Sequence, residues 1–338
     1  MRLPKVLAVS LGGTITMTQG GSAGIVPTLT AADLIRSVPG IEQVAELEAI
    51  SPMRLASASL PVDDLIALAA MLRERLAACA DDANAVDGAV VIQGTDTIEE
   101  TAYLLGLLVG GDKPVVVTGA MRGPQAPGAD GPANLLAATI VAASPAAAGL
   151  GALVVLNDQV HAARYVRKAH TALTSAFASP LAGPVGLVAE GRLSVFLRPP
   201  RTEPILMPAG WREKPDAPVA LIRMALGDDG RLLKALPGLG YRGVVVEGMG
   251  AGHVPQDVAP LLGELATAMP VVLATRVHAG PAFTRTYGYP GSEIDLLARG
   301  LIPGGAIGGL KARILLTLLL RAGLAGDALA AAFGTRSR

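Results

Sequence analysis

The chain has 338 residues, more than one hydrophobic core usually organises, so two domains are expected. Apolar residues make up 51% of it, which excludes a disordered protein. Its 28 Lys and Arg residues balance 28 Asp and Glu residues and form no basic run, which argues against nucleic acid or a membrane surface as a partner.

Short apolar runs that lack the alternation of a half-exposed strand recur along the chain, and each predicts a strand buried on both faces. In chain order they are Val6–Val9, Ala89–Ile92, Pro114–Val117, Ala152–Leu156, Val219–Ile222, Gly243–Val246 and Val271–Leu273. Such strands belong to mostly parallel sheets that helices cover on both sides. The first run is too short for the core of a signal peptide, and the only cysteine, Cys79, cannot form an internal disulfide. We therefore expect a cytoplasmic protein.

Helical segments are predicted between these strands. Thr30-Ala-Ala-Asp33 opens a short helix, and Pro61–Ala80 carries leucines near helical spacing. Thr97-Ile-Glu-Glu100 has the pattern of a capping box at the start of another helix, and Lys311–Arg321 forms a further one. Strands that alternate with helices predict an α/β fold, in which ligands bind beyond the carboxyl ends of the strands.

The composition changes between Arg198 and Pro218, where six prolines gather around the only tryptophan, Trp211. We interpret residues 198–218 as a Pro-rich linker. The chain is then expected to have a larger N-terminal catalytic domain over residues 1–197, with a mostly parallel, doubly covered sheet. A smaller C-terminal α/β domain is expected over residues 219–338.

Residue spacing argues against a bound metal or nucleotide. The four histidines show no metal-ligand spacing; they are His161, His170, His253 and His278. Glycines at Gly248, Gly250 and Gly252 follow a predicted strand, but the third glycine of a dinucleotide fingerprint would fall at His253. We therefore expect neither a metal nor an organic cofactor.

Small hydroxyl residues stand beside glycine at three predicted strand ends. These segments are Leu11–Ile15, Gln93–Glu100 and Val117–Arg122. Each one alone is equally well explained by a helix cap or a tight turn. Together they indicate one site, because loops at the carboxyl edge of a parallel sheet converge on a single crevice.

These segments, with others, make the chain resemble the bacterial-type L-asparaginases (asparaginase/glutaminase). The motifs are GGTI at Gly12–Ile15, GTDTIEETAYLL at Gly94–Leu105, KPVVVTGAMR at Lys113–Arg122, ADGPANLLAA at Ala129–Ala138, LVVLND at Leu153–Asp158 and LKAR at Leu310–Arg313. The resemblance covers nearly the whole chain. It implies hydrolysis of the side-chain amide of asparagine to aspartate and ammonia through an acyl-enzyme. It also implies a homotetramer built from intimate dimers.

The resemblance assigns roles to individual residues. Thr14 matches the family's nucleophile, and a threonine hydroxyl needs a base or a hydrogen-bond chain to become reactive. Thr95, Asp96 and Lys168 match a second Thr-Asp-Lys set. Asp96 would also bind the substrate's α-ammonium group. Lys168 can act as a base only after losing its proton, which burial would have to favour. On sequence alone a solvated surface lysine is the favoured interpretation, and only its place in the family pattern reverses it.

Two further parts of the substrate site follow from the resemblance. Ser57 matches the residue that binds the substrate's α-carboxylate. Backbone amides around Thr95 and Ala120 are candidates for the oxyanion hole, a role that needs no side chain.

The chain also departs from the family pattern. Many members carry an activating tyrosine in the loop after GGTI, but no tyrosine lies between Thr14 and Tyr103 here. Ala58 replaces the glutamine that normally follows the carboxylate-binding serine, and the glutamate usually contributed by a neighbouring subunit has no clear match. We hypothesise that the loop of Tyr287 and Tyr289, from this chain or from a partner subunit, supplies the hydroxyl chain that activates Thr14. The alternative is that these tyrosines only pack the loop.

Other functions remain open at this point. One is a glutaminase-asparaginase of broader specificity, or the related subunit that releases ammonia for amide transfer to tRNA. Another is an amino-acid-binding or sensor protein that has lost catalysis. The missing tyrosine favours the sensor, whereas the joint presence of Thr14, Thr95, Asp96 and Lys168 opposes it.

Overall fold

The structure, a computed structural model, describes residues 2–19, 25–79, 82–213 and 216–337. The chain divides into two compact units, with the boundary between Pro204 and Ile205. That boundary lies within residues 198–218, whose described part contains no helix or strand. Trp211 lies in this stretch, with the guanidinium groups of Arg212 and Arg321 over its ring at 5.3 and 5.1 Å.

The first unit is built on an eight-stranded sheet with the order β12-β11-β8-β7-β6-β5-β1-β4. Five neighbouring strands are parallel: β4 (Glu46–Ile50), β1 (Lys5–Ser10), β5 (Gly88–Ile92), β6 (Val115–Thr118) and β7 (Ala152–Leu156). Antiparallel strands extend the sheet beyond β7: β8 (Gln159–Ala162), β11 (Gly186–Ala189) and β12 (Arg192–Val195). The parallel part therefore places the carboxyl ends of five strands at one edge.

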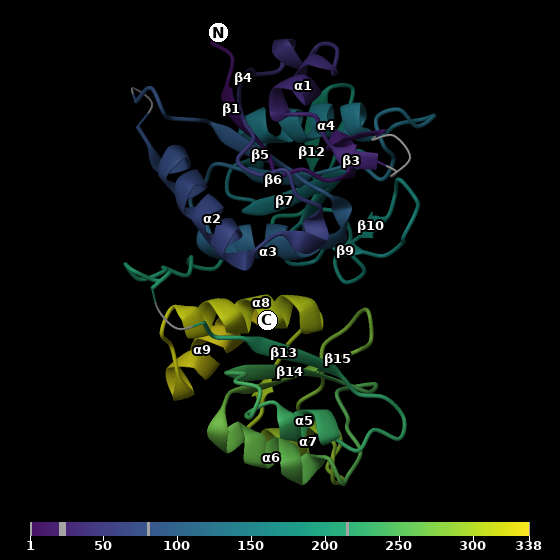
Figure 1. The fold of residues 1–338 in the computed structure, drawn as a ribbon, viewed down its shortest axis with the longest axis vertical. Coiled ribbons are helices and arrows are strands. Elements are labelled where there is room, and N and C mark those ends of the chain that lie inside the picture. The colour runs from purple at the N-terminus through teal and green to yellow at the C-terminus, as the bar shows by residue number, and fades with distance from the viewer. Residues whose placement is uncertain (1, 20–24, 80–81, 214–215, 338) are drawn as a thin grey trace. The chain divides into compact units, whose positions relative to one another are not determined.

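Helices cover both faces of this sheet (Figure 1). On one face α1 (Ala31–Arg36) and α4 (Gly131–Ala143) close a core in which Leu34 and Leu135 pack near Val90 and Leu153. On the other face α2 (Val62–Ala77) packs on α3 (Ile98–Leu108), which contacts β6 and β7. Burial on both faces explains why the central strands are apolar without alternation.

Short elements complete the first unit. Two antiparallel pairs are β2 (Met17–Gln19) with β3 (Ile25–Pro27), and β9 (Arg167–Lys168) with β10 (Phe177–Ala178). Single 3₁₀ turns are η1 (Thr14–Thr16), η3 (Ile41–Gln43), η4 (Ser57–Ser59), η5 (Thr95–Thr97) and η6 (Pro145–Ala147). Three of these turns, η1, η4 and η5, begin at a residue that the sequence singles out as a site residue.

The second unit has a four-stranded parallel sheet in the order β13-β14-β15-β16. Its strands are β13 (Val219–Arg223), β14 (Gly243–Gly248), β15 (Val271–Thr275) and β16 (Ile302–Pro303). Its helices are α5 (Arg231–Ala235), α6 (Ala259–Ala268), α7 (Glu293–Ala298), α8 (Gly308–Arg321) and α9 (Gly326–Ser337). Residues of α5, α6 and α7 share one core with β14 and β15, while α8 packs on β13, β14 and β15 and carries α9. Within the described ranges, no helix combines the length and apolarity that crossing a bilayer requires.

The predicted α/β fold, with a larger parallel sheet and a smaller one, is confirmed. The short helix predicted to open at Thr30 forms, and the structure shows a capping box at its start: the Thr30 hydroxyl accepts from the Asp33 N–H and the Asp33 carboxylate accepts from the Thr30 N–H. The capping box predicted at Thr97 is wrong: α3 has no side-chain cap. The Thr97 hydroxyl instead donates to the carbonyl of Ser57 at 3.1 Å and accepts from Gln93 Nε2 at 3.2 Å.

Candidate active site

The loops after four parallel strands meet at the carboxyl edge of the first sheet. Thr14 begins η1 after β1, and Thr95 begins η5 after β5. Ser57 begins η4 after β4, and Ala120 lies in the turn after β6. Because β4, β1, β5 and β6 are parallel neighbours, these ends lie side by side.

Glycine allows the loops of Thr14 and Thr95 to approach closely. A Cβ placed on Gly13 would lie 1.9 Å from the backbone nitrogen of Gly94, and Gly13 has φ +91°. A Cβ on Gly94 would lie 2.6 Å from Ser57 Oγ. No side chain fits at either position, so glycine fixes how near Ser57, Thr14 and Thr95 come to one another.

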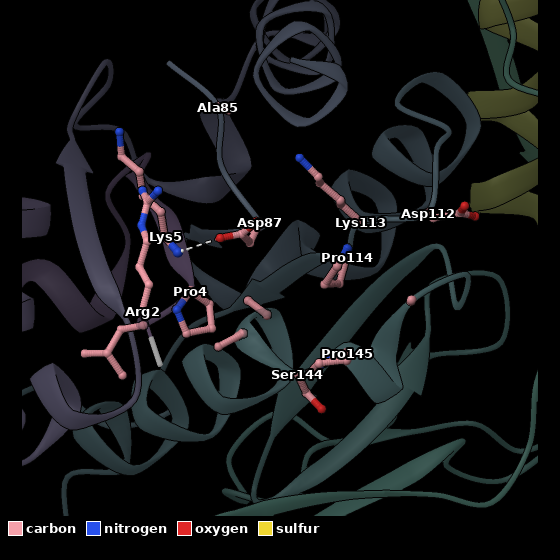
Figure 2. Close-up of a pocket in the computed structure, with 14 residues that line it drawn as sticks. Arg2, Pro4, Lys5, Ala85, Asp87, Asp112, Lys113, Pro114, Ser144 and Pro145 are labelled. Atoms are coloured by element: carbon pink, nitrogen blue, oxygen red, sulfur yellow. Dashed lines mark hydrogen bonds between the residues drawn. The ribbon is translucent and has the colours of Figure 1, made fainter. Parts of the chain in front are cut away.

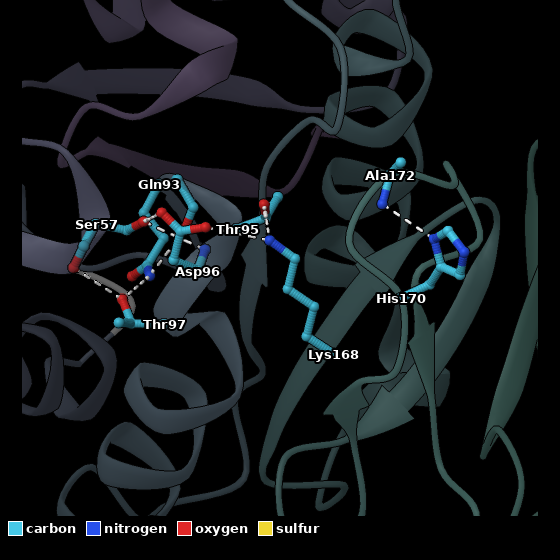
Figure 3. A network of polar contacts seen from close by, with 9 residues as sticks. Ser57, Gln93, Thr95, Asp96, Thr97, Lys168, His170 and Ala172 are labelled. Atoms are coloured by element: carbon cyan, nitrogen blue, oxygen red, sulfur yellow. Dashed lines mark hydrogen bonds and ion pairs between the residues drawn. The ribbon is translucent and has the colours of Figure 1, made fainter.

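Polar side chains from three segments form one network at this edge (Figure 3). Lys168 Nζ donates to Thr95 Oγ1 at 2.8 Å and to Asp96 Oδ1 at 3.2 Å. Ser57 Oγ donates to Asp96 Oδ2 at 3.0 Å and accepts from the Asp96 backbone N–H at 3.2 Å. The structure thus brings together Ser57, Thr95, Asp96 and Lys168, which are up to 111 residues apart (168 − 57).

Lys168 is held at the site rather than extended into solvent. It lies on β9, which pairs with β10 through Phe177, and its side chain is only 18% exposed. Asp96, in contrast, is 63% exposed, so its carboxylate remains accessible to a ligand. The alternative of a solvated surface lysine therefore does not describe Lys168.

The turn that carries Ala120 is held by side chains that the sequence reasoning did not single out. The Asp130 carboxylate accepts from the backbone N–H groups of Met121 at 3.0 Å and Arg122 at 2.9 Å. Asn134 Nδ2 donates to the Gly119 carbonyl at 2.9 Å. Asp130 and Asn134 belong to the ADGPANL motif, which the sequence analysis quoted for the family resemblance. That these two residues hold the Ala120 turn could not be read from the motif alone.

Asn134 also fixes the turn between β7 and β8. Its Oδ1 accepts from the Asn157 backbone N–H at 2.9 Å. Asn157 and Asp158 both have positive φ, at 51° and 60°, as the two central residues of a type I′ hairpin turn require. Asp158 is thus a turn residue at a strand end.

Backbone amides near Thr95 and Ala120 can bind a developing negative charge. The amides of Asp96, Met121 and Arg122 already donate to Ser57 or Asp130. The sequence analysis named the amides around Thr95 and Ala120 as candidates for the oxyanion hole, and these three neighbouring amides are already engaged. Hydroxyl groups, a lysine amine and backbone N–H groups at one sheet edge are the kinds of group that acyl transfer uses.

Tyr287 and Tyr289 lie in the second unit, in the loop between β15 and α7. The Tyr289 hydroxyl lies 2.8 Å from His253 Nδ1, and His253 Nε2 lies 3.1 Å from Glu293 Oε2. The Tyr287 ring contacts the imidazole edge-on, with centroids 5.0 Å apart. Sequence reasoning missed His253 and Glu293, because 40 residues separate them and neither stands in a recognisable motif.

Glu293 is fully buried yet electrostatically satisfied. Burial raises the pKa of its carboxyl, but hydrogen bonds from the backbone N–H groups of Tyr287 and Thr286 and from His253 lower the pKa more, so the net direction is downward. Glu293 is therefore an ionised carboxylate in the interior of the loop.

A separate cavity lies at the opposite, amino edge of the first sheet (Figure 2). It has a volume of about 470 Å³ and is lined by charged residues that include Lys5, Asp87, Asp112 and Lys113. Lys5 and Lys113 donate to backbone carbonyls, and Asp112 pairs with Arg201. These three charged side chains thus have partners within the first unit. The cavity lies away from the hydroxyl network. Among the residues that the structure describes, no group of three or more His, Cys, Asp or Glu side chains is arranged to hold a metal.

Comparisons with known proteins agree over nearly the whole chain. Residues 5–201 match the family model "Asparaginase, N-terminal", and residues 218–333 match "Glutaminase/Asparaginase C-terminal domain". The chain is 34% identical to a "Probable L-asparaginase" of Deinococcus radiodurans, over 95% of this chain and 94% of the relative. It is 35% identical to a "Glutaminase-asparaginase" of Pseudomonas fluorescens, over 94% and 87%.

A solved structure is similar as well. The crystal structure of a probable cytoplasmic L-asparaginase from Campylobacter jejuni has a TM-score of 0.86 and 29% sequence identity to the chain. The match covers 98% of this chain and 99% of the other.

Proposed function

The chain belongs to the bacterial-type L-asparaginase family and is a hydrolase that acts on asparagine, and we propose that it works through an acyl-enzyme formed on Thr14. The single observation that supports this proposal best is the contact of Lys168 Nζ with Thr95 Oγ1 at 2.8 Å, beside the backbone contact of Gly13 and Gly94. A hydroxyl and an amine beside the segment that carries Thr14 support the proposal, because amide hydrolysis requires a nucleophile and groups that transfer protons.

In the proposed binding mode the substrate's own charges orient it. The α-ammonium group lies against the exposed Asp96 carboxylate, and Ser57 turns its hydroxyl from Asp96 toward the α-carboxylate. The side-chain amide then faces the threonine hydroxyls. Asp96 and Ser57 together bind both charged groups of the substrate at fixed positions. A plain amide lacks these two groups, so the site distinguishes a zwitterionic amino acid from it.

The first chemical step would form a new ester. Thr14 Oγ1 bonds to the amide carbon as its proton leaves, and the carbonyl oxygen gains a negative charge held by the amides of Thr95 and Ala120. The carbon–nitrogen bond breaks, and the nitrogen takes up a proton and leaves as ammonia. Water then attacks the ester, with Thr95 and Lys168 assisting the proton transfer, and aspartate is released.

The loop after GGTI lacks the tyrosine that activates the nucleophile in many members of the family. We assign this role to the Tyr287–Tyr289 loop of a neighbouring copy in a homotetramer. Mixing two inactive variants tests this assignment. Random association of Thr14→Ala with Tyr289→Phe chains should restore about a quarter of the sites if two subunits share each site. If each chain completes its own site, mixing restores nothing.

Glutamine hydrolysis is the second candidate activity, because one of the similar relatives is a glutaminase-asparaginase. Ala58, which stands where the family usually has glutamine, lies next to Ser57 and is exposed. Ammonia release from L-asparagine, L-glutamine and D-asparagine, compared as kcat/KM, measures the preference directly.

The acyl-enzyme makes a first testable prediction. We expect Thr14→Ala to lower kcat by about a thousandfold or more, because a nucleophile is lost rather than a contact. Thr14→Ser keeps a hydroxyl and should retain measurable turnover. Rapid quenching followed by peptide mass spectrometry should find an aspartyl ester on the Thr14 peptide. An ester on the Thr95 peptide, or full turnover in Thr14→Ala, would contradict the assignment.

We propose a cytoplasmic location. The similar Campylobacter jejuni structure is that of a probable cytoplasmic L-asparaginase, whereas a relative from Haemophilus influenzae is a probable periplasmic one. Cell fractionation with a compartment marker would decide between them.

A further inference from the structure

Tyr289, His253 and Glu293 form a hydrogen-bonded chain at the carboxyl edge of the second sheet. His253 lies in the turn after β14, and the other two lie in the loop and at the helix start after β15. The Tyr289 hydroxyl lies 2.8 Å from Nδ1, and Nε2 lies 3.1 Å from the Glu293 carboxylate. An oxygen acid, a base and an orienting carboxylate in this order form the arrangement that activates nucleophiles in hydrolases.

The ionised carboxylate decides which imidazole nitrogen carries the proton. Glu293 is 0% exposed and accepts from the backbone N–H groups of Thr286 at 2.8 Å and Tyr287 at 2.7 Å. A carboxylate only accepts, so His253 Nε2 carries a hydrogen toward it. In the neutral imidazole Nδ1 is then an acceptor, and the Tyr289 hydroxyl donates to it.

This arrangement leaves the Tyr289 oxygen with its lone pairs directed away from His253. Tyr289 is 48% exposed, so a ligand can approach this side chain. An incoming hydroxyl can donate to the tyrosine oxygen while the tyrosine's own proton moves to Nδ1. Tyr287 is similarly exposed, at 41%, but it meets His253 through its ring. The two tyrosines are therefore not equivalent.

The surrounding backbone holds the chain in place before any ligand binds. Ser292 Oγ donates to the Tyr287 carbonyl at 2.7 Å, and the Val254 N–H donates to the Gly291 carbonyl at 2.9 Å. A Cβ on Gly291 would lie 2.4 Å from the Val254 carbonyl oxygen. The loop after β15 is thus fastened directly to the turn that carries His253.

We propose that Tyr289 of a neighbouring copy, rather than its Tyr287, is the proton acceptor for Thr14, and that His253 and Glu293 of the same copy act through it as positioning residues. The inference rests on the proposed function, in which this loop serves the Thr14 site. The Thr14 proton passes to the Tyr289 oxygen, and the Tyr289 proton passes to His253 Nδ1. Thr14 Oγ1 bonds to the amide carbon, whose carbonyl electron pair moves to oxygen. The imidazolium, paired with Glu293, returns a proton by the same route to the departing ammonia.

Tyrosine reactivity tests the chain without reference to catalysis. N-acetylimidazole should acetylate Tyr289 about tenfold faster than Tyr287, because His253 draws off the phenolic proton. In His253→Asn the rate at Tyr289 should fall to that of Tyr287. His278→Asn, which changes an exposed histidine in the same loop region, should leave both rates unchanged. Equal rates in the unmodified protein, or a fast Tyr289 in His253→Asn, would overturn the proposal.

Steady-state kinetics test whether Tyr289 and His253 act as one proton path. Tyr289→Phe and His253→Asn should each lower kcat about 100-fold while KM changes less than about threefold. The double variant should be no slower than either single variant, since both remove one proton path. Tyr287→Phe should keep kcat within about threefold. Losses that multiply in the double variant would mark His253 as a structural support only and overturn the proposal.

Imidazole rescue separates proton transfer from loop support. Free imidazole should raise the turnover of His253→Ala at least about tenfold and leave Tyr289→Phe unaffected. If imidazole does not rescue His253→Ala and Tyr289 is acetylated in that variant as fast as in the unmodified protein, the proposed proton path is wrong. Failure of the proposed function gives a different pattern: Thr14→Ala keeps its turnover, while the acetylation rates still report on Tyr289 and His253.

Discussion

Ser57 makes two hydrogen bonds to a single residue, donating to the Asp96 carboxylate and accepting from the Asp96 amide. In the proposed binding mode it therefore has two tasks: it orients Asp96, which binds the ammonium group, and it offers its own hydroxyl to the carboxylate. Both tasks concern the ends of the substrate rather than the amide. Its loss should affect binding more than chemistry.

A substitution at Ser57 checks this division. Ser57→Ala should raise KM for asparagine about tenfold and change kcat less than about threefold. Ser59→Ala changes an exposed serine in the same 3₁₀ turn and should alter neither constant. Steady-state ammonia release gives both constants. A fall in kcat with KM unchanged would place Ser57 in the chemical step instead.

At the scale of elements, the site depends on backbone segments that touch. Gly13 after β1 and Gly94 after β5 leave no room for a side chain between them. Gly111, between α3 and β6, has a similar positive φ of +77° but nothing within 4 Å of its missing Cβ. Gly13 and Gly111 both have a positive φ, but only Gly13 also lies against another backbone segment. Comparing the two positions therefore separates the effect of φ from the effect of close approach.

This pair makes a prediction about elements. Gly111→Ala should cost about 1 kcal/mol of stability, from its φ alone, and should keep full activity. Gly13→Ala adds the clash with Gly94, so it should lose more stability and lower kcat/KM at least about a hundredfold. Thermal unfolding and ammonia release measure the two effects. Equal outcomes at both positions would show that the contact has no role.

Sequence patterns predicted the elements that are buried on both sides. All seven apolar runs are strands in the structure, because their neighbours on either face are helices. β4, β11 and β12 were not predicted: β4 carries Glu46 and Glu48 at a sheet edge, and β11 alternates buried with exposed residues. The capping box at Thr97 was predicted wrongly because the Thr97 hydroxyl donates to the Ser57 carbonyl, 40 residues away in the sequence.

The site was predictable to the extent that strand ends and family motifs determine it. Ser57, Thr95, Asp96 and Lys168 do meet, but the sequence alone favoured a solvated surface position for Lys168. Its contact with Thr95 depends on the pairing of β9 with β10. These strands have two residues each, which is too short to give a recognisable sequence pattern. The His253–Glu293 pair arises in the same way, from two loops that only the fold brings together.

At the scale of the whole molecule, one buried histidine links stability to pH. His161 on β8 is 1% exposed, and its Nδ1 lies 2.9 Å from Ser179 Oγ. Among the described residues, its Nε2 has no hydrogen-bond partner. Burial lowers the pKa of His161 to about 4. The folded protein therefore binds fewer protons than the unfolded chain between pH 4 and the ordinary pKa of 6.5.

The sign of the pH effect follows from this difference. Stability should fall as the pH drops through that window, by up to about 3 kcal/mol at its lower end. Urea unfolding at about pH 7 and about pH 4.5 measures the fall. His161→Gln should remove much of it, whereas His170→Gln, at an exposed position, should not. An unchanged pH dependence in His161→Gln would contradict the prediction.

The single tryptophan gives the chain an unusual optical property. Trp211 lies just beyond the boundary, in the second unit, with Arg212 and Arg321 over its ring. Tryptophan fluorescence therefore reports on the second unit only, while the hydroxyl network of the first unit contributes nothing to it. Following emission and ammonia release in the same denaturation series would show whether the two units unfold together or one after the other, without any added label.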